Sequence, residues 1–358
     1  MKRFIYIIAI LLFASCVEED FFGLSDYGRI KNIVVSNQAS NAVIDNSNFH
    51  ITLEIPGGID LSAITIQEMS LSSFAVADKK VGDILDLTAE EQIKVTSESG
   101  KEYIWTVESY VASATPQITN WQLNDWYQTS KGYYEPGADA ASTVWGTGNP
   151  GSALVGKYAT VPEDFGNDNY GARMETLDNG WAGIPLNTPI SAGAIFTGYF
   201  DTDKLDPTNP AAATIFGTSF SGRPDMLRFK YSYKAGEVNK DRQGNVLDYP
   251  DGCDIYALLE IRKDGKKERL ATAWFRSSDT QEEMKTVEMP FYYGELDNSF
   301  PDYMMPVDHD FVSADSSSYA LPTHISLIAT SSFGGDAFEG AIGSTLIIDD
   351  LEMVYEEE

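Results

Sequence analysis

The chain has 358 residues, of which 54 are acidic and 25 are Lys or Arg, so its formal net charge is -29. This charge works against binding to nucleic acid, which needs a basic surface to replace the counterions of the phosphates, and against adhesion to anionic lipid head groups. Hydrophobic residues make up 43% of the chain, which argues against an intrinsically disordered protein, and the length favours two domains.

The N-terminus has the pattern of a bacterial signal peptide. Lys2 and Arg3 are followed by an apolar run over residues 4–13 that is too short to span a bilayer. Two small residues then precede Cys16, as in the lipobox of bacterial lipoproteins, and no other cysteine lies nearby to explain it. We predict that residues 1–15 are removed and that Cys16 carries a lipid. The alternative is an ordinary secretory signal with an incidental cysteine.

An acidic segment follows the predicted lipid anchor. Glu18, Glu19 and Asp20 resemble the export signal that sends lipoproteins of glycan-degrading gut bacteria to the outer face of the outer membrane. A plain solvated tether has the same composition. We predict a tether over residues 16–28 and an outer-membrane location facing the cell exterior, with the membrane contacted only through the lipid.

Residues 29–112 predict a first, small β-domain. Short apolar runs alternate there with turn formers such as Pro56-Gly57-Gly58, and Trp105 falls on the apolar face of an alternating strand, as a core residue does. The phrases "GIDLSAITI" and "SGKEYIWTV" resemble the immunoglobulin-like modules of surface glycan-utilisation proteins. An immunoglobulin-like β-sandwich is therefore expected, followed by a linker over residues 113–119, which lack periodicity and contain a proline.

Residues 120–358 predict a second, larger β-domain. In "MLRFKYSYK", Leu227, Phe229, Tyr231 and Tyr233 alternate with polar residues and are expected to face the core. No long helical period and no fixed repeat interrupts the strands. An all-β chain with a larger β-sandwich of jelly-roll type is expected, whose long loops carry the function.

Several phrases of this domain resemble the putative carbohydrate metabolism domain family, among them "NWQLNDWY", "TVWGTGNPG", "GARMET", "SGRPDMLRFKYSYK" and "SSFGGDAFEGAIGSTLIIDDLEMVY". Gly146 departs from the pattern, because an acid is expected there. The resemblance implies a jelly-roll domain like those of carbohydrate-binding modules and some glycoside hydrolases, and it implies a carbohydrate ligand. It does not imply a particular reaction.

Candidate sugar-binding residues are aromatic side chains and planar polar groups, because sugars present apolar C–H faces and rims of hydroxyls. Trp145 stands between glycines, with Asn149 close by, and is either a core residue or a ligand contact. Arg173 and Arg223 stand beside small or rigid residues and either point into a cleft or form salt bridges. The predicted ligand-binding residues are Trp126, Trp145, Asn149, Arg173, Trp181 and Arg223.

Catalysis by histidine or cysteine is poorly supplied, since the three histidines lie outside any "GxSxG" or "HExxH" motif. A carboxylate pair, as in glycoside hydrolases, is the remaining option. Glu175 and Asp336 stand out because they lie near aromatic and glycine-rich phrases, although each is also explained as a solvated or turn-forming acid. Glycan binding therefore ranks above hydrolysis, and a structural surface protein without activity is the third reading.

Asp349 is the candidate metal ligand. In a regular strand it would share the inward face with Ile347, Leu351 and Met353, where an unpaired carboxylate is costly. A hydrogen-bonded or cation-paired aspartate is one explanation, and a structural calcium is the other. We expect no required cofactor, carbohydrate as the ligand, and other glycan-utilisation surface proteins as candidate partners.

Overall fold

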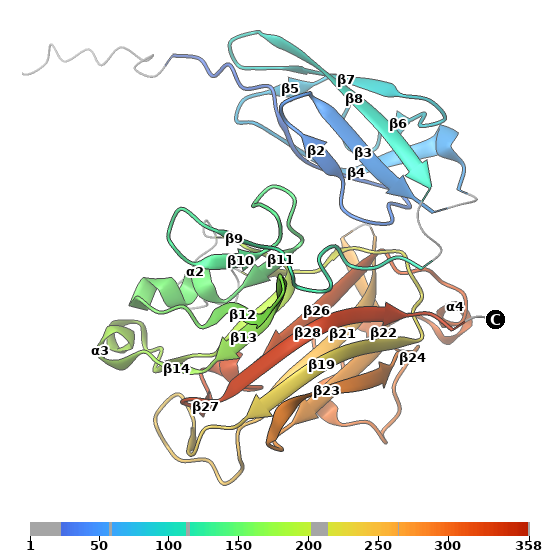
Figure 1. Cartoon of the computed structure of the whole chain (residues 1–358). Helices are drawn as coiled ribbons and strands as arrows, with labels where there is room; N and C mark the ends of the chain where they lie inside the picture. The colour runs from blue at the N-terminus through green and yellow to red at the C-terminus, as the bar shows by residue number, and fades with distance from the viewer. Residues whose placement is uncertain (1–22, 57–58, 112–114, 202–213, 264, 357–358) are drawn as a thin grey trace, which may run out of the picture. The chain divides into compact units, whose positions relative to one another are not determined.

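The computed structural model describes residues 23–56, 59–111, 115–201, 214–263 and 265–356 (Figure 1). The predicted signal peptide, Cys16 and the first part of the tether lie outside the described residues. The chain divides into two compact units, one of residues 1–35, 44–51 and 62–108, the other of residues 36–43, 52–61 and 109–358. The predicted boundary at residues 113–119 stays a prediction.

The N-terminal strands form an immunoglobulin-like β-sandwich of two sheets, as predicted. One sheet has the order β1-β4-β6 and the other β2-β3-β8-β7-β5. Trp105 on β8 is fully buried, and its indole N–H donates to the carbonyl of Gly28 at 3.0 Å, which confirms it as a core residue. The strands are β1 (Ile30–Val35), β2 (Val43–Asp45), β3 (His50–Ile55), β4 (Ile64–Leu71), β5 (Val76–Ala77), β6 (Ile84–Leu85), β7 (Glu91–Thr96) and β8 (Glu102–Val111).

Two large sheets make up the jelly-roll sandwich. The five-stranded sheet has the order β12-β13-β28-β19-β23, and the nine-stranded sheet follows β11-β16-β26-β21-β22-β24, with β17, β18 and β25 paired alongside. Their strands are β11 (Trp145–Thr147), β12 (Thr160–Gly166), β13 (Asn169–Glu175), β16 (Ala194–Phe200), β17 (Thr214–Phe216), β18 (Thr218–Ser219), β19 (Met226–Lys234), β21 (Cys253–Lys263), β22 (Lys266–Ser277), β23 (Gln281–Pro290), β24 (Tyr292–Tyr293), β25 (Asp310–Phe311), β26 (His324–Thr330) and β28 (Thr345–Val354).

Short elements in the connections surround the two sheets. The small strand pairs are β9 (Trp126–Gln128) with β10 (Tyr134–Pro136), β14 (Leu177–Asp178) with β15 (Ile190–Ser191), and β20 (Asn239–Lys240) with β27 (Gly340–Ala341). The α-helical turns are α2 (Asn149–Ser152), α3 (Gly180–Gly183) and α4 (Ala314–Ser317). The 3-10 turns within the described residues are η1 (Leu61–Ala63), η2 (Ala153–Val155), η3 (Ile184–Leu186), η6 (Asp302–Met304) and η7 (Gly335–Ala337).

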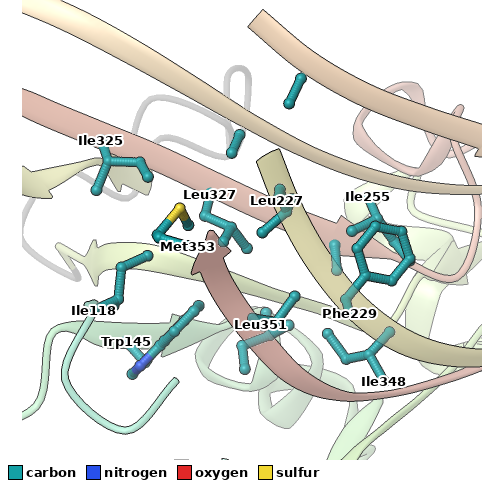
Figure 2. Packing of buried hydrophobic residues seen from close by; sticks show 14 of the residues in the cluster. Ile118, Trp145, Leu227, Phe229, Ile255, Ile325, Leu327, Ile348, Leu351 and Met353 are labelled. Atoms are coloured by element: carbon teal, nitrogen blue, oxygen red, sulfur yellow. The ribbon is translucent and has the colours of Figure 1, made fainter. Parts of the chain in front are cut away.

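The main hydrophobic core contains side chains from both large sheets (Figure 2). Leu227 and Phe229 on β19 lie with Ile255 on β21 and Leu327 on β26 in this cluster. The alternation predicted for β19 is confirmed, because Tyr231 and Tyr233 are buried with Leu227 and Phe229. Residues of β21 and β22 that alternate with these core positions must point to the opposite face of the nine-stranded sheet.

A β-bulge in β28 corrects the register predicted for the last strand. Asp350 has a φ of +54°, and the pairing of β28 with β19 shifts by one residue at this point. Leu346 and Ile348 are buried before the bulge, and Leu351 and Met353 are buried after it. Strict alternation predicts that Ile347 faces inward with Leu351 and Met353, but it lies on the other face of the strand. The extra residue of a bulge reverses the alternation of side chains, which a strictly periodic strand does not allow for.

Candidate functional site

Aromatic and charged side chains gather on the face of the nine-stranded sheet that points away from the core. Asp254 and Tyr256 on β21 lie opposite Arg276 and Trp274 on β22. The rings of Tyr256 and Trp274 stack, with centroids 3.9 Å apart and planes 12° apart. The ring of Tyr303, which is 39% exposed, lies 5.5 Å from that of Trp274. We call Asp254, Tyr256, Trp274, Arg276 and Tyr303 the aromatic cluster.

Arg276 is held rigidly within this cluster. Its guanidinium pairs with both carboxylate oxygens of Asp254, and the Nε–Oδ1 distance is 2.7 Å. The same group lies 3.9 Å from the ring centroid of Tyr303 and 4.4 Å from that of Phe333. The indole N–H of Trp274 also donates to Asp254 at 3.2 Å. A two-point ion pair and two aromatic contacts fix the geometry of the charged groups before any ligand arrives.

Tyr256 carries a hydroxyl near the centre of the cluster, beside the ring of Trp274. This hydroxyl makes no hydrogen bond within the part of the chain that the structure describes, and Tyr256 is partly buried, with a hydroxyl oxygen that is not fully enclosed. Burial raises the pKa of Tyr256, and the carboxylates of Asp254 and Asp336 raise it further. The guanidinium groups of Arg269 and Arg276 act in the opposite direction but do not cancel the increase. The hydroxyl therefore stays protonated at neutral pH and is available as a hydrogen-bond donor.

A layer of buried charge adjoins the aromatic cluster on the same sheet face. The carboxylate of Glu260 pairs with Arg262 and with Lys267, the latter at 3.2 Å, and accepts a hydrogen bond from Ser326. Burial alone would raise the pKa of Glu260, but Arg262, Lys267 and Arg269 outweigh it and lower this pKa. Glu260 is therefore an ionised structural group and does not serve as a general acid.

Two residues predicted to contact a ligand are instead buried. Trp145 is only 2% exposed, belongs to the hydrophobic core, and donates its indole N–H to the carbonyl of Thr119 at 2.7 Å. Asn149 is fully buried, and its amide bonds to the backbone of Thr160 and Tyr134. The neighbouring glycines do not leave Trp145 open, because its side chain packs into the core cluster although β11 lies at the edge of the sheet, beside β16. In this structure neither side chain is accessible to a ligand.

Three further predicted ligand residues lie apart from the aromatic cluster. Trp126 is half-buried against the core and donates to the carbonyl of Leu123, whereas Trp181 on α3 is 85% exposed. Arg223 lies 3.9 Å from the ring centroid of Tyr293 and donates to two backbone carbonyls. Within the described residues, no hydrogen bond, ion pair or ring contact joins these three side chains to one another or to the cluster.

Of the predicted carboxylate pair, only Asp336 belongs near the aromatic cluster. Glu175 on β13 of the five-stranded sheet pairs with Arg173 at 2.9 Å, and Arg173 also approaches Glu163 at 3.5 Å. Asp336 on η7 is exposed, has no ion-pair partner among the described residues, and influences the pKa of Tyr256. The role of the pair in catalysis stays a prediction.

Asp349 is buried beside the bulge of β28. Its carboxylate accepts a hydrogen bond from the backbone N–H of Asp350 at 2.9 Å. Burial and the neighbouring Asp350 raise the pKa of Asp349 to about 6, although Lys230 and Asn169 act in the opposite direction. The described residues contain no group of three or more His, Cys, Asp or Glu side chains arranged to hold a metal ion. A structural calcium at Asp349 stays a prediction.

The fold and the family match define a carbohydrate-related β-sandwich domain. The chain belongs to the family of the putative carbohydrate metabolism domain, whose model matches residues 119–354, so the resemblance found in the sequence is confirmed. The solved structure of a putative glycoside hydrolase from Bacteroides thetaiotaomicron is similar, with a TM-score of 0.59 and 25% identity, and the match covers 93% of this chain and 98% of that one.

A second solved structure supports the same fold. It is a putative glycoside hydrolase from Bacteroides vulgatus, with a TM-score of 0.51 and 28% identity, and the match covers 65% of this chain and 95% of that chain. No curated protein matches the chain.

Proposed function

We propose that the chain is a glycan-binding protein and that the aromatic cluster is its binding site. The unpartnered hydroxyl of Tyr256 carries the proposal. A protonated donor can bond a sugar hydroxyl, while the aromatic rings beside it offer contact to the apolar C–H face of the sugar. A sugar ring would pack on the exposed ring of Tyr303, one of its hydroxyls would accept from Tyr256, and another would donate to Asp336.

Membership of the family and the similarity to two putative glycoside hydrolases favour a carbohydrate over other ligands. The net charge of -29 makes nucleic acid an unfavourable ligand.

We also propose that Cys16 anchors the protein to the outer membrane, facing the exterior. No helix in the described part of the chain is long and apolar enough to cross a membrane. Lipid labelling that persists in a Cys16→Ala protein would contradict the anchor.

Glycoside hydrolysis is the second candidate function. The observation that favours it is that two carboxylates, Asp254 and Asp336, both act on the pKa of the same Tyr256 hydroxyl. Against it, both oxygens of Asp254 are occupied by Arg276 and Trp274, which leaves this carboxylate poorly placed to attack or to transfer a proton. Release of reducing sugar that Asp336→Asn abolishes, with binding retained, would favour hydrolysis.

The test is a binding screen against plant and host glycans with Tyr256→Phe. Phenylalanine keeps the stacked ring and removes only the hydroxyl, so the free energy of unfolding should stay unchanged while affinity falls about fivefold, as expected for one hydrogen bond. Tyr199→Phe is the matched control, since Tyr199 is 58% exposed and lies outside the cluster. Equal losses in both variants, or none in either, would contradict the site. Absence of any glycan binding by the wild-type protein would favour a structural surface protein.

A further inference from the structure

A pocket of about 530 Å³ lies in the jelly-roll domain, outside the aromatic cluster. Its apolar lining comes from Ile190 on β15, from Val238, and from Phe338 and Ile342 on either side of β27. Three acidic residues, Asp178, Glu237 and Asp241, also line it together with Lys240. Of the three acids, Asp178 and Glu237 are exposed. Apolar walls with a few carboxylates are suited to a sugar ring, whose C–H faces need apolar contact and whose hydroxyls need acceptors.

The pocket and the aromatic cluster share one loop. Phe333 packs on the guanidinium of Arg276 at 4.4 Å and so borders the cluster, whereas Phe338, five residues later, lines the pocket. Asp336 lies between these two phenylalanines in the sequence and influences Tyr256 in the cluster. A ligand that extends past Asp336 along this loop therefore meets the pocket.

A second loop links the two places in the same way. Its residue Asp241 lines the pocket, and Arg242 lies 4.7 Å from the ring centroid of Phe338. Further along this loop, the ring of Tyr249 stacks on Phe333, with centroids 6.0 Å apart and planes 28° apart. This loop thus contacts Phe338 at the pocket through Arg242 and Phe333 beside the cluster through Tyr249.

The two loops are fixed to each other by backbone pairing. Strand β20 of one loop pairs antiparallel with β27 of the other, with Asn239 opposite Ala341 and Lys240 opposite Gly340. The spacing between pocket and cluster is therefore set before a ligand binds, which lowers the entropic cost of holding one ligand at both places.

We propose that the pocket is a second subsite for the glycan, so that the ligand is an extended oligosaccharide and not a single sugar. This inference rests on the proposed glycan-binding function of the aromatic cluster. A chain that contacts both places gains affinity because the second contact is intramolecular once the first has formed. Affinity should then rise with chain length until the ligand spans both places.

Length-graded oligosaccharides from disaccharide to hexasaccharide, derived from cellulose, xylan, mannan, starch and mixed-linkage β-glucan, test this inference by calorimetry on the full chain. The wild-type protein should bind the longest member of its preferred series about tenfold more tightly than the shortest. Phe338→Ala should remove this gain and leave the affinity for the shortest binding member unchanged. Ile342→Asp, at an exposed position of the same lining, should do the same if Phe338→Ala fails to fold. Val246→Ala is the control, since Val246 is exposed and does not line the pocket.

Equal affinity of the wild-type protein for short and long members would overturn the second subsite and leave the cluster as the binding site. A loss in the pocket variants that is the same for every length would also overturn it. If the wild-type protein binds no member of any series, the proposed glycan function fails, and the second subsite fails with it.

Discussion

Glu135 on β10 is a buried carboxyl that lacks a full set of partners. It is 6% exposed; Oε1 accepts a hydrogen bond from Thr147 at 2.9 Å, and Oε2 has no partner in the described structure. Burial raises the pKa of Glu135 from 4.5 to about 7, despite the opposing hydrogen bonds from Thr147. The folded chain thus holds this proton more tightly than the unfolded chain. Below about pH 4.5 the carboxyl is protonated in both states and does not lower the free energy of unfolding. Between about pH 4.5 and pH 7 it lowers this free energy increasingly, and above about pH 7 the penalty stays constant.

Glu135→Gln should therefore stabilise the protein at high pH. Glutamine keeps the shape and carries no charge, so the free energy of unfolding of the variant should exceed that of the wild type by about 3 kcal/mol at about pH 8, and the difference should nearly vanish at about pH 4.5. Urea unfolding at both pH values measures it. Glu282→Gln, at an exposed position, is the control and should show no such pH dependence. A constant difference at all pH values would contradict a raised pKa.

Single tryptophans show why local sequence does not determine which aromatic side chains lie in the core. Trp145 has glycine neighbours that suggest an open face, yet it is a core residue. Trp274 stands in "ATAWFRS", a phrase that reads as an ordinary strand, yet it belongs to the aromatic cluster. Whether a tryptophan on a strand is exposed depends on the segments that pack around that strand in the fold, and the local sequence contains little of that information.

Asp251, two residues before β21 begins, holds the loop that borders both proposed subsites. One of its carboxylate oxygens accepts hydrogen bonds from Ser332 at 2.6 Å, from Ser344 at 2.7 Å and from the backbone N–H of Ala341 at 2.8 Å. All four residues are buried. A single charged acceptor thus ties residues 332–344 to the start of a core strand.

Asp251→Ala should lower the free energy of unfolding by about 3 kcal/mol, because three buried donors lose their acceptor at once. Asp248→Ala, three residues earlier at an exposed position, is the control and should change stability little. Denaturant unfolding of both variants compares them. If the two variants lose similar stability, Asp251 does not anchor this loop.

Strand positions were predictable, but strand registers were not. The core face of β19 follows from strict alternation and is confirmed. Counting back from the pair Lys263 and Lys266 would place Tyr256 opposite Ala273 on β22, but a one-residue irregularity at Leu259 and Glu260 places it opposite Trp274. A bulge of this kind brings the two rings of the cluster together. No residue type marks it in advance, because the bulge depends on packing across the sheet.

For the whole molecule, the all-β class and the family were within reach of the sequence. Turn formers between short alternating strands predict sandwiches, and extended phrases of the second domain matched the family over residues 119–354. The candidate site was not within reach, since its residues come from β21, from β22 and from the connection around Tyr303. These segments meet only when the nine-stranded sheet has formed.

A crystal structure with a bound oligosaccharide from the glycan screen tests the central claim most directly. The account predicts a sugar ring against Tyr303 and Trp274, with one of its hydroxyls within hydrogen-bond distance of the Tyr256 hydroxyl, whose donor capacity is otherwise unused. A sugar bound only elsewhere, for example at the exposed Trp181 or at the ion pairs of Arg173 on the five-stranded sheet, would contradict it.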